Sequence, residues 1–393
     1  MVGGGSSSGG SGGRLHGFDG LRAIAACSIV VLHVTGATNA SVHGPFSHYF
    51  ARFDAGVAIF FVISGFLLYR PFVAAHLDAG RSVAVRHFYW RRAIRIYPAY
   101  WIALTATIVL FGTAHIHGAW QYVQHYLLVQ IYTPKLLSGI VPAWTLAVEV
   151  SFYAVLPAYA WLLHRLTAAR AASARIAVEL AAAAIVYGGA LVGRALVGSA
   201  TSPDNYKLKW LPFMADWFAL GLALAVVKVA YDAGLASKAL RRAVDWADRA
   251  PTVLAIVGVL AFVAVAHIGL PTTFRSGTVA QDVERQILYG VMAASFVGVA
   301  AWSVSGRGAV RAALDARVMV LLGTISYGIF LWHDQILAQL MKWNFPDHVR
   351  HGTTLALFVV VFAATVAVAT ASWVLVERPL LRRPVEGRAA ARR

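Results

Sequence analysis

The sequence predicts an all-α, polytopic membrane protein with about ten transmembrane helices and both termini in the cytoplasm. Hydrophobic residues make up 59% of the 393 residues and charged residues only 13%, which is far from the composition of a soluble domain. The chain divides into about ten apolar segments, each near the ~20 residues that span a bilayer. Most of the 34 Lys and Arg residues fall on alternate connections, which is typical of cytoplasmic loops.

The apolar runs place the expected spans at residues 21–40, 53–74, 93–112, 143–164, 175–198, 209–230, 251–270, 285–305, 318–341 and 353–376. With both termini inside, the number of spans must be even. The net charge of +17 is then explained by topology and by anionic lipid, so nucleic acid is not an expected partner. We expect a multi-pass protein of the plasma or inner membrane.

The predicted organisation is one membrane domain between two short tails. Residues 1–17 form a flexible Gly/Ser-rich cytoplasmic tail, 18–379 the transmembrane domain and 380–393 a basic cytoplasmic tail. The stretch GGGSSSGGSGG has no basic region before an apolar one and no cleavage site, so it is not interpreted as a signal peptide. Cys27 is the only cysteine, which excludes an intramolecular disulfide.

The first span carries two ionisable residues in the run GLRAIAACSIVVLHV. Arg22 and His33 are eleven residues apart, so at ~100° per residue they share one helix face and differ in depth by roughly 16 Å. Ionisable side chains inside a membrane are costly and usually functional. The alternative is that His33 only packs, with a hydrogen bond to a neighbouring helix.

The third span opens with RRAIRIYPAYW, which contains Arg91, Arg92 and Arg95. Arg92 and Arg95 are three residues apart and therefore present adjacent guanidinium groups on one face. Two such groups favour a polyanion. The alternative is cytoplasmic anchoring by positive charge, which suits Arg91 better than Arg95 because Arg95 lies inside the apolar run.

Two further spans carry polar groups at a depth similar to that of His33. In PAWTLAVEVSFY, Glu149 follows Trp144 by five residues, and helix rise places it roughly level with His33 in the outer half. His333, in GTISYGIFLWH, lies in the outer half by the same reasoning. Glu149 is expected to pair with His33 and fix the imidazole tautomer. Alternatives are a structural partner role for Glu149 and an interfacial role for His333 beside Trp332.

These stretches, in this order, resemble the motif series of the membrane acyltransferase-3 family. The resemblance runs from Phe18 to about Pro379 and rests on FDGLRAIAACSIVVLH, GVAIFFVISGFLLYRPF, RRAIRIYPAYW, PAWTLAVEVSFY, LGTISYGIFLWH and VERPL. It implies a polytopic enzyme that moves an acyl group, often acetyl, from a cytoplasmic donor to a hydroxyl of a sugar, glycan, lipid or macrolide. It also implies a catalytic role for His33 and essential roles for Arg22, Arg92 and Arg95.

The sequence departs from the family pattern at a few positions. Thr145 stands where the family usually has Ser, and Phe330 replaces a frequent Tyr. Val150 and Ser151 replace a common Glu-Gln pair, which removes polar groups beside Glu149.

The residues and the resemblance together suggest one mechanism. Acyl-CoA, expected as a co-substrate with no bound cofactor, has its phosphates held by Arg22, Arg92 and Arg95. His33 takes the proton from the acceptor hydroxyl as that hydroxyl attacks the thioester. Direct transfer is preferred because no GxSxG elbow occurs in the apolar segments, and the alternative is a transient acyl-His33. The candidate acceptor or oxyanion contacts are Tyr327, Ser326, His333 and Trp144, although buried Tyr and Ser residues often only connect helices.

Other patterns receive simpler interpretations, and one rival function stays open. AHIHG, with His115 and His117, is expected to be an exposed outer loop rather than a metal site, and no metal is expected. ISGF around Ser64 and Gly65 indicates close helix packing.

The rival function is a transporter or flippase of a lipid-linked or acylated product. The sequence has no inverted repeat to support it, and a transporter would yield no covalent product.

Overall fold

The computed structural model describes residues 16–78, 82–114, 116–134, 138–201, 205–273, 277–302, 308–345 and 353–382, and their secondary structure is helical throughout. The helices are α1 His16–Ala37, α2 Ser47–Phe50, α3 Gly56–Leu77, α4 Val85–Ala106, α5 Ala119–Tyr126, α6 Trp144–Thr167, α7 Ala172–Ala200, α8 Leu211–Asp232, α9 Lys238–Arg249, α10 Pro251–His267, α11 Val279–Trp302, α12 Ala309–Leu314, α13 Arg317–Thr324, α14 Ser326–Lys342, α15 Thr353–Ser372 and α16 Arg378–Arg382. Short 3-10 turns cover Phe53–Ala55, Gln130–Tyr132, Val141–Ala143 and Tyr206–Lys209, and π-helical turns cover Thr107–Phe111 and Trp373–Glu377.

The all-α class is confirmed, and the helices have the length expected of a membrane protein. Within the described ranges, seven helical segments are long and apolar enough to cross a bilayer, or eight if α9 and α10, which meet at 86°, form one span. Helix α11 carries charged residues in its first two turns, and α14 has only 17 residues. Both helices nevertheless lie within or overlap predicted spans, α11 at 285–305 and α14 at 318–341. The count of ten and the cytoplasmic position of the termini stay predictions.

Two predicted segments differ from the helices that form. Residues 318–341, expected as one span, are divided at Ile325 into α13 and α14. The Ser326 hydroxyl donates to the main-chain oxygen of Gly323 at this break, because a short polar side chain competes with the helix for carbonyl groups. The third predicted span forms α4, which begins at Val85 rather than near residue 93. Arg91, Arg92 and Arg95 therefore all lie within the helix.

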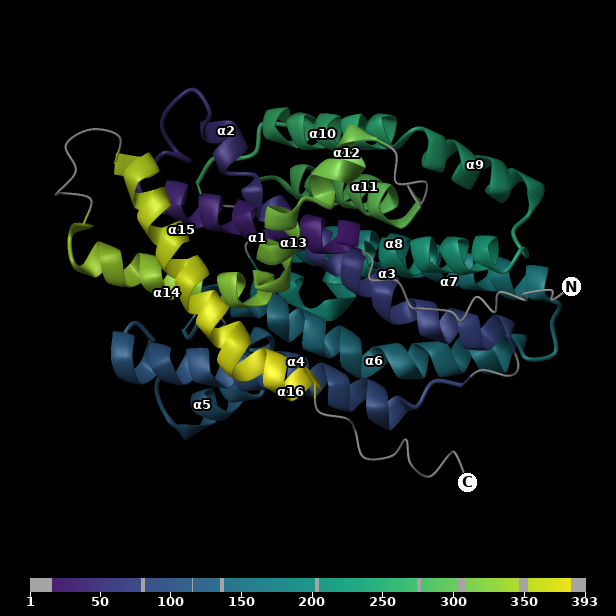
Figure 1. The fold of residues 1–393 in the computed structure, drawn as a ribbon, viewed down its shortest axis with the longest axis horizontal. Coiled ribbons are helices and arrows are strands. Elements are labelled where there is room, and N and C mark those ends of the chain that lie inside the picture. Colours follow the sequence, from purple (N-terminus) through teal and green to yellow (C-terminus); the bar gives the residue numbers. More distant parts are fainter. Residues whose placement is uncertain are drawn as a thin grey trace, which may run out of the picture.

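Helices α3, α6, α7 and α8 run side by side along the long axis of the molecule, α10 and α11 pack together above them, and α15 crosses obliquely to bring α16 against α4 (Figure 1). The contact between α3 and α8 depends on two glycines. A Cβ atom on Gly65 would lie 2.4 Å from the main-chain oxygen of Phe218, and one on Gly221 would lie 2.3 Å from that of Val62. Small residues let membrane helices approach this closely, so the packing role expected for Gly65 is confirmed.

Helix α1 is held near its amino-terminal end by backbone contacts with the segment around α13. A Cβ atom on Gly20 would lie 2.2 Å from the oxygen of Leu314, and one on Gly323 would lie 1.9 Å from that of Asp19. This contact fixes the turn that carries Arg22. Positions 1–15 and 383–393, which hold most of the two expected tails, lie outside the described residues. His115 of the AHIHG stretch also lies outside them.

Candidate active site

A cavity lies between α1, α3, α4, α6 and α14, and it brings together polar residues from each of these helices. It holds about 810 Å³ of empty space, counted out to its opening. Its apolar walls include Phe60, Phe61 and Phe330. Its polar lining consists of Arg22, Ser64, Arg92, Arg95, Thr145, Glu149, Tyr153, Ser326 and Tyr327.

The three arginines predicted from the sequence all line this cavity. Arg22 is paired with Asp19 at 3.0 Å, and the Arg92 guanidinium lies 5.9 Å from the ring centroid of Tyr153. Arg95 has no hydrogen bond or ion pair with any described residue. Arg91 is exposed and does not line the cavity, in line with the anchoring interpretation. The cavity therefore has an excess of positive charge, with at least one guanidinium free to bind an anion.

Glu149 lies among these arginines and not beside His33. Its Oε1 accepts hydrogen bonds from Ser64, at 2.5 Å, and from Tyr153, and its charge is within electrostatic range of Arg22 and Arg92. No contact between Glu149 and His33 occurs within the described ranges, so the expected pairing is wrong. Helix rise gives depth only along each helix's own axis, whereas packing sets the tilt and offset between helices.

His33 instead contacts His333, which comes from α14. The distance from Nδ1 of His33 to Nε2 of His333 is 3.1 Å, and the ring centroids are 5.0 Å apart. His33 is partly exposed, whereas His333 is fully buried. The Phe330 ring lines the cavity and lies 6.1 Å from the His333 ring, while Phe60 packs edge-on against Phe330 at 6.3 Å. An aromatic wall thus separates the arginine-lined cavity from the histidine pair.

The other residues predicted to contact the acceptor or the oxyanion differ in whether they line the cavity. Tyr327 and Ser326 line the cavity, but both hydroxyl hydrogens are used by main-chain oxygens: Tyr327 donates to Ile96 at 2.7 Å, and Ser326 to Gly323. Tyr327 thereby connects α14 to α4, as the helix-connecting alternative expects. Trp144 does not line the cavity, and its ring lies 4.0 Å from Nζ of Lys209.

Sequence reasoning missed Ser64 and Tyr153 as members of the site. Tyr153 follows Glu149 by four residues and therefore shares its helix face, so the spacing contained a usable signal. Ser64 was interpreted only through the packing of its neighbour Gly65. Nothing in the sequence shows that its hydroxyl faces α6, because that orientation depends on how α3 is rotated against its neighbours.

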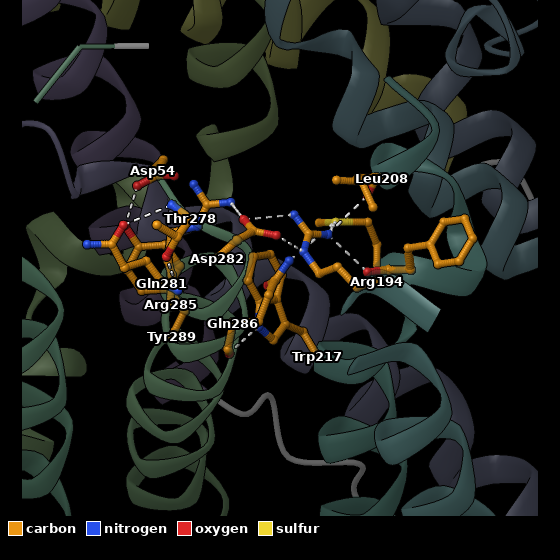
Figure 2. Close-up of polar contacts among 12 residues, drawn as sticks. Asp54, Arg194, Leu208, Trp217, Thr278, Gln281, Asp282, Arg285, Gln286 and Tyr289 are labelled. Atoms are coloured by element: carbon orange, nitrogen blue, oxygen red, sulfur yellow. Dashed lines mark hydrogen bonds and ion pairs between the residues drawn. The ribbon is translucent and has the colours of Figure 1, made fainter. Parts of the chain in front are cut away.

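A second polar cluster lies at the start of α11, away from the cavity, and the sequence analysis missed it. Asp282 sits between the guanidinium groups of Arg194 and Arg285, with Oδ2 2.5 Å from Nε of Arg194 (Figure 2). Arg194 also donates to the main-chain oxygens of Leu208 and Phe213. The buried charges are therefore paired and hydrogen-bonded, as a stable ion pair in a low-dielectric interior requires.

The chain is similar to known proteins over most of its length. A family model described as an acyltransferase domain matches residues 15–374. Relatives include Nodulation protein 10 of Rhizobium leguminosarum bv. viciae, 24% identical over 95% of this chain and 95% of that protein, and the exopolysaccharide production protein ExoZ of Rhizobium meliloti (strain 1021), 25% identical over 86% and 92%. The putative peptidoglycan O-acetyltransferase YrhL of Bacillus subtilis (strain 168) is 26% identical over 82% of this chain and 48% of its own length.

No solved structure matches the chain significantly. The family match nevertheless spans the helices that build the cavity, from α1 to the π-helical turn after α15. The chain therefore belongs to the acyltransferase-3 family and is an enzyme that transfers acyl groups.

Proposed function

We propose that this enzyme moves an acyl group, most simply acetyl, from cytoplasmic acyl-CoA to a hydroxyl of a carbohydrate. The observation that carries the proposal is the convergence of Arg22, Arg92 and Arg95 on one cavity that contains a single lining carboxylate, Glu149. Guanidinium groups match phosphate oxygens bidentately and remain charged at any physiological pH. A donor that carries several phosphates fits this excess of positive charge.

The reaction uses His33 as the general base. The phosphates of the donor bind the arginines, and its thin pantetheine arm passes the wall formed by Phe60 and Phe330 toward His33. His33 takes the proton of the acceptor hydroxyl as the oxygen attacks the thioester carbonyl carbon. The tetrahedral intermediate then expels the CoA thiolate, which receives the proton from His33. The acyl group ends as an ester of the acceptor, and no other reactant is needed.

The names of the relatives support a glycan as the acceptor. ExoZ is named for exopolysaccharide production and YrhL as a putative peptidoglycan O-acetyltransferase. These two names suggest a hydroxyl of a cell-envelope glycan as the acceptor, and a hydroxyl of a glycosylated metabolite is the alternative that the sequence resemblance implies. The position of His33 eleven residues beyond Arg22 on α1 favours an acceptor that arrives from the extracytoplasmic side of the plasma or inner membrane.

The proposal is tested with purified protein in lipid nanodiscs and acetyl-CoA labelled in the acetyl group. The label should move into polysaccharide or muropeptide acceptors as an alkali-labile ester, and nanodiscs without protein give the background. The same preparation should release free CoA only when acceptor is present. Transport of an acylated glycan across vesicles with no label transferred would support the transporter alternative and overturn the proposal.

A further inference from the structure

We infer that His333 is a positioning residue for the base His33: it accepts the hydrogen on Nδ1 of His33, so that Nε2 is left as the basic nitrogen. The inference rests on the proposed function for its catalytic consequence, but the proton arrangement itself follows from the geometry. It assigns to His333 a role different from the acceptor contact expected from the sequence.

The positions of the ring hydrogens follow from two main-chain carbonyl groups. Nδ1 of His333 lies 3.0 Å from the oxygen of Ile329, and Nδ1 of His33 lies 2.9 Å from the oxygen of Ile29. A carbonyl oxygen can only accept, so both Nδ1 atoms carry hydrogen. In the neutral ring of His333, Nε2 then holds a lone pair. It is this atom that lies 3.1 Å from Nδ1 of His33, so His33 is the donor of the pair, and its single Nδ1 hydrogen is shared between the Ile29 oxygen and Nε2 of His333.

This arrangement leaves Nε2 of His33 unprotonated in the neutral state. The atom has no hydrogen-bond partner among the residues that the structure describes, and His33 is partly exposed. The opposite assignment requires a cationic His333 that donates to His33. It would place a bare Nδ1 lone pair 2.9 Å from the Ile29 oxygen and a charge on a ring with 0% exposure, and both are unfavourable.

The pair also prepares His33 for the charge that it acquires. When Nε2 takes a proton from the acceptor, the imidazolium strengthens its Nδ1 hydrogen bond to His333, because hydrogen bonds from a charged donor are stronger than neutral ones. The neighbouring Asp334 lies within electrostatic range of His33.

His333 is held rigidly enough for this role. Helix α14 packs on α15 so closely that a Cβ atom on Gly328 would lie 2.9 Å from Cβ of Ala369. The Phe330 ring and the Ile329 oxygen fix the imidazole further. A locked partner holds the base in one orientation, which an unsupported histidine would have to adopt at an entropic cost.

The test compares two substitutions that differ in their ability to accept a hydrogen bond. His333→Gln places an amide oxygen near the former Nε2, whereas His333→Phe fills the space with no acceptor. We expect kcat to fall at least about tenfold in His333→Phe, part of the ~10²–10⁴-fold effect of a general base, and to recover largely in His333→Gln. KM for acetyl-CoA should not change in either variant, because the arginines are untouched. Equal turnover in both variants and the wild type would overturn the inference.

A second measurement reads the proton position directly and does not depend on activity. In protein labelled with ¹⁵N-histidine and studied above neutral pH, the His33 signals, assigned by their loss in His33→Ala, should show hydrogen on Nδ1 and a bare Nε2. Hydrogen on Nε2 would overturn the inference even if His333→Phe does not fold. Absence of acyl transfer by the wild type would instead refute the proposed function, and the NMR result would still decide the proton arrangement.

Discussion

The hydroxyl of Ser64 donates a hydrogen bond of 2.5 Å to Oε1 of Glu149, joining α3 to α6 inside the cavity. With Tyr153 as a second donor, this bond fixes the carboxylate at the arginine-lined end of the site. Glu149 therefore lies where the phosphates of the donor are proposed to bind, and it neutralises part of the positive charge there. Substitution of Glu149 is therefore expected to change the affinity for the donor more than it changes proton transfer by His33.

Glu149→Gln should tighten the binding of acyl-CoA. Glutamine keeps an acceptor for Ser64 but removes a negative charge that repels the donor phosphates, an effect on the order of 1 kcal/mol, or about fivefold in Kd, at an effective dielectric constant near 20. Calorimetric titration with a non-hydrolysable acyl-CoA analogue measures it, with Ser64→Ala as a control that keeps the charge. Unchanged affinity together with a large loss of kcat would return Glu149 to the role of partner for His33.

His33→Ala should abolish acyl transfer while membrane insertion and yield stay near those of the wild type. Loss of a general base costs ~10²–10⁴-fold, whereas removing a polar side chain from a span does not impair insertion. Label transfer from acetyl-CoA and size-exclusion chromatography of the same preparation measure both properties. Retention of more than about a tenth of wild-type turnover would show that another group takes the proton.

Arg95→Ala should raise KM for acyl-CoA, and Arg92→Ala should behave similarly, because both side chains line the cavity. A charge-assisted hydrogen bond to phosphate contributes about 1.5–3 kcal/mol, so each loss should raise Kd roughly tenfold or more. Arg91→Ala is the matched control, since Arg91 lies on the same helix but is exposed outside the cavity. Equal donor affinity in all three variants would mean that the donor binds elsewhere.

Gly65→Ala should destabilise the protein, because its Cβ atom would lie 2.4 Å from the oxygen of Phe218 and force α3 and α8 apart. Overpacking of this kind costs roughly 1–3 kcal/mol. Gly189→Ala, on an exposed face of α7 with no atom within 4 Å of the new Cβ, should be neutral or slightly stabilising. Melting temperatures in the same detergent compare the two. A similar Tm for both variants would contradict the close packing of α3 on α8.

Asp282→Leu should lower stability strongly, because Arg194, which is 5% exposed, would lose its carboxylate partner. Removing one member of a buried ion pair typically costs ~3–5 kcal/mol. The double variant Arg194→Leu with Asp282→Leu should regain much of that loss, since the buried charge of Arg194 is removed and the guanidinium that still lacks its carboxylate, Arg285, is partly exposed. Thermal unfolding of the single and double variants measures the coupling. Additive losses would show that the two charges do not stabilise one another.

The helices and several of their functional side chains could be predicted from the sequence. Each of the ten apolar segments is largely helical where the structure describes it, although 318–341 forms two helices, and spacing and depth point to Arg22, Arg92 and Arg95, which line the cavity. In lipid, a chain must satisfy its main-chain hydrogen bonds within the segment. An apolar run of this length is therefore expected to be helical. The positions of charged residues within such a run are equally local information.

The tertiary structure decided which of these residues meet. It joined His33 to His333, which is 300 residues away, and placed Glu149 with the arginines, although helix rise had put it level with His33. It also divided the ninth segment at Ile325 and turned Ser64 toward α6. Sequence periodicity defines the faces of one helix. The tilt, rotation and offset between helices depend instead on the close fit of small residues, such as Gly20, Gly65 and Gly323, against backbone that is distant in the sequence. No single segment encodes that fit.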